Sequence, residues 1–140
     1  MTYSEYNDNL VPKWVRIAVG LLALLTIAFG AMGYFSSGPL FGNESVNTSL
    51  GWITRAMYEF SARNMAIGIV MGLVSAKGVP ESIAALTIVR ALVELQTIVI
   101  TVTSSDFTGA ILPVVLLIIE AVVIKTMFDV IQKRDKENKG

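Results

Sequence analysis

The chain has 140 residues, of which 54% are hydrophobic and 16% are charged, and its formal net charge is zero. Typical soluble domains carry roughly 25% charged residues, and a soluble chain of this length could not bury so much apolar surface. The composition therefore predicts a single membrane domain over residues 1–140. Zero net charge and the lack of a basic, aromatic stretch exclude nucleic acid as an expected partner.

Histidine and cysteine are both absent. Disulfides, thiolate nucleophiles, the usual zinc sites and histidine-ligated haem are therefore excluded. We predict no metal site, no catalytic residue and no resident cofactor, and a quinone-like molecule is the kind of ligand left open. Chemistry would have to come from carboxylates, Arg, Lys, Tyr or hydroxyl groups.

Four apolar runs approach the roughly 20 residues needed to cross a bilayer. In chain order they cover residues 14–35, 56–76, 82–103 and 109–130, separated by SSGPLFGNESVNTSLG, KGVPE and SSDFTG. These punctuating segments are rich in Gly, Pro, Ser and Asn, which favour turns and loops. The sequence thus predicts an all-α integral membrane protein, an up-and-down bundle of four transmembrane helices.

The first run, 14–35, also resembles a signal peptide, since Lys13 and Arg16 precede an apolar core that ends in small residues. The run is longer than the apolar region of about 7–15 residues typical of such peptides, and three more runs follow it. We therefore expect a retained helix.

Basic residues predict the orientation. They lie before the first run (Lys13, Arg16), in the second loop (Lys77) and after the fourth run, whereas the other two loops offer only Arg55. By the positive-inside rule both termini face the cytoplasm, and the protein resides in the cytoplasmic (inner) membrane. The lipid bilayer is then its first partner.

The second run carries Gly68 and Gly72 four residues apart. Small residues at this spacing allow another helix to approach closely. Packing within the chain is favoured over a dimer face, and a homo-oligomer or a larger membrane complex remains an alternative partner.

Seven of the polar or charged residues inside the last three runs are candidates for a polar core: Glu59, Arg63, Asn64, Arg90, Glu94, Gln96 and Glu120. Counting about 1.5 Å of rise per residue from the predicted outer end places Arg63 level with Glu94, and Arg90 level with Glu120. Arg90 and Glu94 are four apart and share a face. We predict a polar core of ion pairs between the second, third and fourth helices, with the first helix outside it.

Two interpretations of this polar core stand open. The ion pairs either fix helix register, or they line a cavity for a ligand or a proton path, the default hypothesis for ionisable residues within a membrane. Two stacked pairs together with Asn64, Gln96 and several Thr favour the second interpretation.

The stretch from Arg63 to Lys125 resembles small bacterial four-helix membrane proteins of the DoxX-like kind. The resemblance lies in ARNMAIG (62–68), the short basic loop AKG (76–78), IVRALVEL (88–95) and LLIIEAVV around Glu120. It covers about half of the chain and implies an inner-membrane protein of mostly unassigned activity, sometimes associated with quinol-oxidising or other redox assemblies. It brings no catalytic motif.

Three function hypotheses follow. The first is a non-catalytic module that binds a quinone-like or lipid-like molecule, or an accessory subunit of a membrane complex. The second is a small oligomeric transporter or channel that uses Glu94 or Glu120 as its coupling carboxylate. The third is an intramembrane enzyme with Glu/Arg acid–base chemistry, for which no residue pattern is specific.

Overall fold

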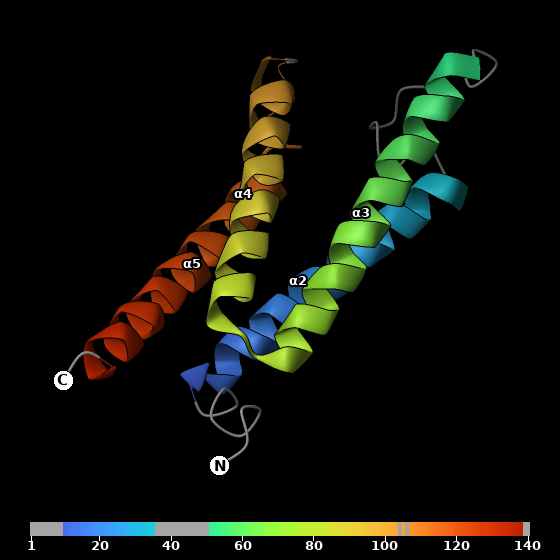
Figure 1. Cartoon of the computed structure of the whole chain (residues 1–140). Helices are drawn as coiled ribbons and strands as arrows, with labels where there is room; N and C mark the ends of the chain where they lie inside the picture. Colours follow the sequence, from blue (N-terminus) through green and yellow to red (C-terminus); the bar gives the residue numbers. More distant parts are fainter. Residues whose placement is uncertain (1–9, 36–50, 104, 106, 139–140) are drawn as a thin grey trace. The chain divides into compact units, whose positions relative to one another are not determined.

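All four predicted helices are present in a computed structural model that describes residues 10–35, 51–103, 105 and 107–138 (Figure 1). The elements are α2 (Lys13–Phe35), α3 (Gly51–Lys77), α4 (Pro80–Thr103) and α5 (Ile111–Glu137), and the described residues contain no strand. The all-α prediction is confirmed. The predicted N-terminal tail falls almost wholly on residues 1–9, outside the described part.

The helices exceed the apolar runs that predicted them. Helix α3 begins at Gly51 where the run begins at 56, and α5 continues to Glu137, seven residues beyond the run that ends at 130. The segment added to α5, IQKRDKE, is rich in Lys, Glu, Arg and Gln, which have good helix propensity, whereas the segment added to α3, GWITR, has only Arg55 of this kind. Hydrophobicity therefore marks the part of a helix suited to the bilayer, and the helix itself continues into water.

Three helices, α2, α4 and α5, are long and apolar enough to cross a membrane. Only about a third of each apolar stretch is buried inside the molecule, and large hydrophobic side chains such as Ile17, Leu24 and Ile100 are more than 60% exposed. Such a surface would be insoluble in water, so the protein is membrane-embedded and these side chains contact lipid. Helix α3 falls outside this set because it carries Arg55, Glu59, Arg63 and Lys77.

The described residues form two compact units: one comprises residues 20–73, the other residues up to 19 together with 74–140. The boundaries fall within α2 and α3, so each unit contains parts of these helices. The prediction of one membrane domain remains a prediction.

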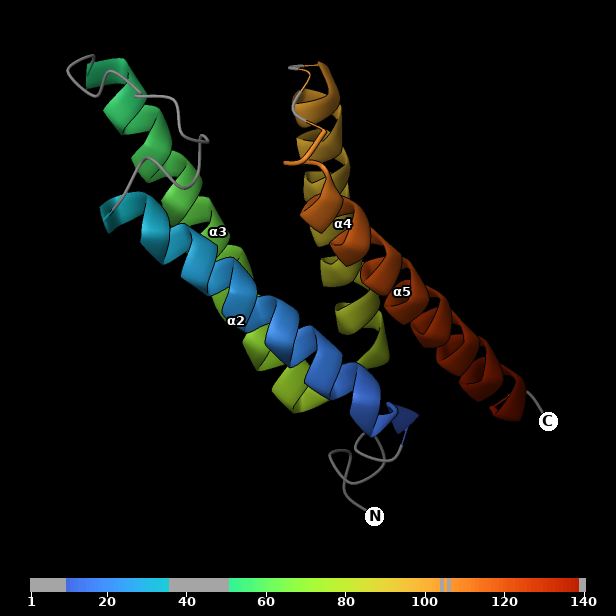
Figure 2. The ribbon, with the colours of Figure 1, turned by 180° about the vertical axis from the view of Figure 1, so that it is seen from behind.

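In the unit of residues 20–73, α2 and α3 run antiparallel and side by side (Figures 1 and 2). Tyr34 stacks on Tyr58 with ring centroids 5.4 Å apart. Further along, Gly68 lies against Ala23 and Ile27. These contacts span 11 residues of α2, about 16 Å of helix. Over this length α3, with its charged residues, lies directly beside the apolar half of α2.

The closest approach of α2 and α3 depends on two glycines. A methyl group added at Gly68 would lie 2.8 Å from the Ala23 carbonyl oxygen, and one added at Gly30 would lie 2.8 Å from the Ser61 carbonyl oxygen. At Gly72 the nearest atom would be Ala23 Cβ at 3.9 Å, an ordinary contact. Gly68 therefore serves packing within the chain, Gly72 is not required for close approach, and Gly30 is a contact that the sequence did not reveal.

In the other unit, Arg16 fastens the start of α2 to the end of α3. Its Nε donates a hydrogen bond to the Ser75 carbonyl (3.1 Å) and its Nη2 to the Ala76 carbonyl (2.6 Å), while Ser75 Oγ donates to the Arg16 carbonyl (2.6 Å). These carbonyls belong to the last turn of α3, which has no helical donors for them. Gly78 follows with φ +67°, the left-handed conformation that commonly ends a helix.

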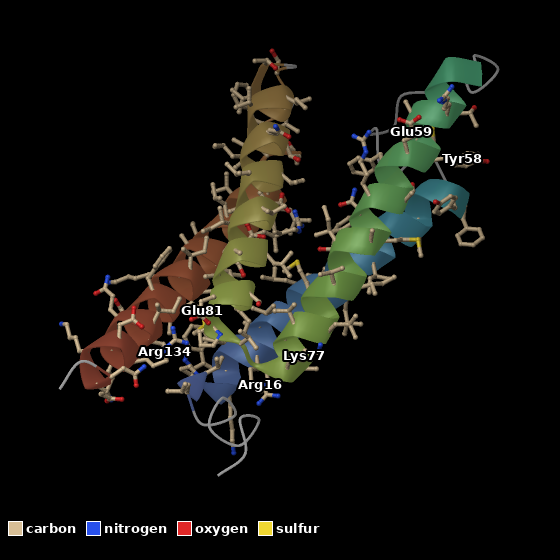
Figure 3. The ribbon with its side chains drawn as sticks, viewed as in Figure 1. Arg16, Tyr58, Glu59, Lys77, Glu81 and Arg134 are labelled. Atoms are coloured by element: carbon tan, nitrogen blue, oxygen red, sulfur yellow. The ribbon has the colours of Figure 1, made fainter. Side chains whose placement is uncertain are left out.

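Helices α4 and α5 pack along an antiparallel seam in this unit (Figures 1 and 2). The buried positions recur every three or four residues: Pro80, Ile83, Ala84, Thr87, Arg90 and Glu94 on α4, and Pro113, Leu116, Glu120, Val123 and Met127 on α5. This is the spacing of one helix face turned toward a partner. Glu81 and Arg134 form an ion pair at one end, where Figure 3 shows them side by side.

Candidate functional site

The α4–α5 seam holds three buried charged side chains, the only ones among the described residues: Arg90, Glu94 and Glu120. We call them the buried triad. The Arg90 guanidinium forms an ion pair with Glu94 one turn along α4, and its Nε lies 3.9 Å from Glu120 Oε1 on α5. A buried Arg–Glu salt bridge is thus confirmed, and Arg90 meets the carboxylate of α5 that lies at its own predicted depth.

Each member of the triad occupies a regular seam position. Arg90 and Glu94 continue the buried series that includes Thr87 on α4, and Glu120 stands midway between Leu116 and Val123 on α5. Neither glutamate could turn outward without rotating its whole helix and exposing the apolar members of the seam to a different surface. Packing of the helices therefore forces the charges inward.

Glu120 is the least satisfied member. Its side chain is 0% exposed, and neither carboxylate oxygen has a hydrogen-bond partner among the described residues. The Arg90 contact at 3.9 Å is an ion pair without a hydrogen bond, since N–H···O bonds end near 3.2 Å. A buried acceptor left in this state costs about 1–3 kcal/mol, and more when it is charged. Glu120 is therefore suited to accept a hydrogen bond or a proton.

The charges of the triad do not balance. One guanidinium faces two carboxylates, so full ionisation leaves one negative charge in an apolar seam. A buried charge without compensation is strongly destabilising. The seam is neutral when one carboxylate carries a proton or when a cationic group approaches from outside the pair of helices, and a neutral hydrogen-bond donor would solvate the remaining charge without cancelling it. The fully ionised triad therefore has one carboxylate more than its single guanidinium can neutralise.

Glu59 and Arg63 lie elsewhere, on α3. Their side chains are 50% and 78% exposed, and they form an ion pair of 3.7 Å, with Arg55 on the other side of Glu59 at 3.0 Å. Figure 3 shows Glu59 next to Tyr58, at the opposite end of α3 from Lys77. The predicted pair of Arg63 with Glu94 would join the two units, and it stays a prediction.

The two predicted amides have different surroundings. Asn64 is 8% exposed and its Nδ2 donates to the Phe60 carbonyl (3.0 Å), within α3. Gln96 is exposed on α4, where it lines a shallow hollow with Leu95, Val99 and Ile100.

Three threonines of α4 extend the series of the triad and were not singled out from the sequence. Thr87 is fully buried, whereas Thr97 and Thr101 are half-buried. Each hydroxyl donates to the carbonyl four residues earlier, at 2.7–2.9 Å. The spacing 87, 90, 94, 97, 101 alternates three and four residues, which places all five side chains on one helix face. That spacing was visible in the sequence and could have identified them.

The described residues contain no group of three or more Asp, Glu, His or Cys that could hold a metal ion. The chain matches no protein-family model, no curated protein and no solved structure. Function has to be argued from the triad itself.

Proposed function

We propose that the protein is a small non-catalytic membrane module that binds an amphipathic molecule through a hydrogen-bond-donating head group at Glu120. The observation that carries this proposal is the pair of Glu120 oxygens, fully buried and without hydrogen-bond donors. A quinone-like molecule in its hydroxylated form, or a lipid-like molecule with a hydroxyl or amine head group, has both the donor and the apolar tail that the site requires.

Arg90 and Glu94 support this role as positioning residues. The guanidinium has several donors in a rigid fork and lies between both carboxylates. It therefore keeps the excess negative charge near Glu120 and holds that carboxylate in place without satisfying it. An incoming donor completes the hydrogen bonding of Glu120 and removes the cost of its isolation.

A place as accessory subunit of a larger inner-membrane complex, with both termini in the cytoplasm, belongs to the same proposal. It agrees with the basic residues at the end of α5, where Arg134 and Lys136 lie in the last turn. It is also the setting that a DoxX-like relationship implies. The lipid-exposed faces of α2, α4 and α5 offer ample surface for neighbouring subunits.

Native mass spectrometry of the protein released from lipid nanodiscs tests the binding role. We expect the wild type to retain a small molecule with a hydroxyl or amine head group, Glu120→Gln to lose it, and Glu137→Gln to retain it. Glu137 makes a matched control because it lies on the same helix and is exposed. Size-exclusion elution and helical circular dichroism establish that each variant is folded.

Two outcomes would overturn the proposal. One is a folded wild type that retains nothing under conditions that preserve annular lipid. The other is Glu120→Gln retaining the same molecule to the same extent as Glu137→Gln, because the head group would then not bind at Glu120.

The charge excess of the triad favours a second candidate, a proton-coupled transporter that acts as an oligomer. A coupling carboxylate must change its protonation during the cycle, and a seam with two carboxylates and one guanidinium has one group free to do so. Proton flux into proteoliposomes, followed with an internal pH-sensitive dye, distinguishes the candidates. The transporter requires flux that Glu120→Gln abolishes, and the binding module gives none above empty vesicles.

A further inference from the structure

On α4 the face that carries the triad is polar toward one end of the seam and apolar toward the other, while the buried α5 side is apolar in both directions, with Pro113 and Leu116 toward Thr103. Toward the end of α4 at Thr103, the face of the triad continues with Thr97 and Thr101, both half-buried. Toward Pro80, it continues with Ile83, and the α5 side of the seam continues with Val123 and Met127, all 0% exposed. The two ends of the seam therefore differ in access and, on α4, in polarity.

At the polar end, the polar side chains of α4 are spaced so that water molecules could connect them; we call the row Glu94, Thr97 and Thr101 the track. From Arg90 to Thr101 is 11 residues, or about 16 Å of helix, and polar side chains stand at every third or fourth residue between them. Neighbours at this spacing have Cβ atoms about 5–6 Å apart, a gap that one water molecule bridges. The threonine hydroxyls donate to backbone carbonyls, so their oxygens remain able to accept hydrogen bonds from water.

The apolar end has no such groups. Between Pro80 and Arg90 the only polar side chain on the buried face of α4 is Thr87, which differs from Thr97 and Thr101 in being 0% exposed. Buried water needs two to four polar partners, and the fully buried side chains of Ile83, Val123 and Met127 offer none. Water is therefore excluded from this side of Glu120.

We propose that Glu120 exchanges its proton with only one side of the membrane, the side that holds the α4–α5 connection, through water along Glu94, Thr97 and Thr101. The inference rests on the proposed function: once the donating head group leaves, a proton on Glu120 removes the excess negative charge of the triad. A hydrated proton transfers to a Glu120 carboxylate oxygen, forming one O–H bond and releasing water, and the reverse step deprotonates it. No other reactant is required.

The groups that face Glu120 within this unit agree with such a role. Arg90 and Glu94 are the charged ones, both on α4, and its nearest seam neighbours on α5, Leu116 and Val123, are apolar. Glu94 lies between Glu120 and the polar end along the track, so a proton arriving from Thr97 meets a carboxylate before it reaches Arg90. The ion pair of Arg90 with Glu94 leaves Glu120 as the acceptor at the end of the track.

The chain contains no cysteine, so in a single-cysteine variant the introduced thiol is the only one that can react. Its reaction rate therefore reports the access of water and reagent to that position. The informative variants are Thr97→Cys, Thr101→Cys and Thr87→Cys in reconstituted vesicles, treated with a charged, membrane-impermeant methanethiosulfonate. This reagent reacts with the thiolate, which forms in water and is suppressed in apolar surroundings. Val99→Cys is the matched control, because Val99 lies between the two threonines in depth and is 55% exposed on the lipid side.

Two further variants define the sides of the vesicle. Phe107→Cys marks the side of the α4–α5 connection, and Glu137→Cys marks the other side; both positions are exposed. We expect Thr97→Cys and Thr101→Cys to react on the order of ten times faster than Val99→Cys, and only with reagent on the Phe107 side. Thr87→Cys should not react from either side.

Two results would overturn the one-sided track: Thr97→Cys reacting no faster than Val99→Cys, or Thr87→Cys reacting as fast as Thr97→Cys. Because Thr101 lies nearer the end of α4, its variant gives an independent measurement if Thr97→Cys does not fold. Thiol reactivity measures water alone and needs no ligand. A dry track would thus refute this inference and leave binding at Glu120 to be decided by mass spectrometry.

Discussion

The contrast between Gly68 and Gly72 gives a quantitative test of the α2–α3 packing. Both lie in the interior of α3, so replacing either by Ala removes the same helix penalty of glycine, on the order of 1 kcal/mol. Only at position 68 does the new methyl group meet backbone, at 2.8 Å from the Ala23 carbonyl oxygen and 3.0 Å from the Ile27 nitrogen. Backbone cannot rotate away, so α2 and α3 must separate locally.

The difference between the two variants isolates the cost of that separation. Overpacking a close-fitting interior costs about 1–3 kcal/mol. Gly72→Ala meets only Ala23 Cβ at 3.9 Å, so we expect it to be neutral or stabilising by up to about 1 kcal/mol. Gly68→Ala should then be less stable than Gly72→Ala by about 1–3 kcal/mol, and Gly30→Ala should behave like Gly68→Ala.

Unfolding by sodium dodecyl sulfate, followed by circular dichroism in mixed micelles, gives the free energies of unfolding on a common scale. Equal stability of Gly68→Ala and Gly72→Ala would refute the packing described for residues 20–73. In that case the face of α3 that carries Gly68 and Gly72 could instead contact another subunit.

Three further changes test the remaining contacts with the same unfolding assay. Arg16→Ala removes two charged hydrogen-bond donors from the last turn of α3 and should lower the free energy of unfolding by about 2–3 kcal/mol. An unchanged unfolding midpoint would show that these hydrogen bonds do not hold the start of α2 against the end of α3. Glu81 lies just before the apolar run 82–103, and the hydrogen bond from Arg134 lowers its pKa. The ion pair therefore stabilises the protein at neutral pH, and this stabilisation is lost as the pH falls through the lowered pKa. Glu81→Gln should cost under about 1 kcal/mol and match the wild type in acid; a pH-independent difference would exclude a charge effect. If Arg63 pairs with Glu94, their two Gln variants and the double variant should be equally destabilised, whereas additive effects would rule that pair out.

The sequence was sufficient for the helices because each depends on local hydrophobicity. It was also sufficient for the contact of Arg90 with Glu120, since depth along a membrane helix follows from residue number and a fixed rise. Depth alone does not give rotation about the helix axis, and rotation decides which residues at one level meet. Within its own unit Arg63 forms an ion pair with Glu59 on the same helix, a contact that counting depth does not predict.

Gly30 and the threonines of α4 show two different limits of prediction from the sequence. Gly30 has Thr26 four residues before it, a small-xxx-small pair, but the pattern does not say which helix approaches, and the role of Gly30 appears only when α3 is placed against it. The threonines did follow a detectable pattern. Hydroxyls bonded to their own helix are common and inexpensive in a membrane, so their presence indicates function only beside a buried carboxylate.

The number of charges in the seam separates the structural interpretation of the triad from the functional one. A single Arg–Glu pair suffices to fix register, and Arg90 with Glu94 already forms a neutral pair within α4. Glu120 adds a second carboxylate whose oxygens are both unsatisfied, which weakens the packed seam instead of strengthening it. A fully buried carboxylate that lowers stability has an explanation if it binds a proton or a hydrogen-bond donor for part of the time. Register alone therefore explains Arg90 and Glu94, whereas the unsatisfied oxygens of Glu120 are what the proposed binding role would explain.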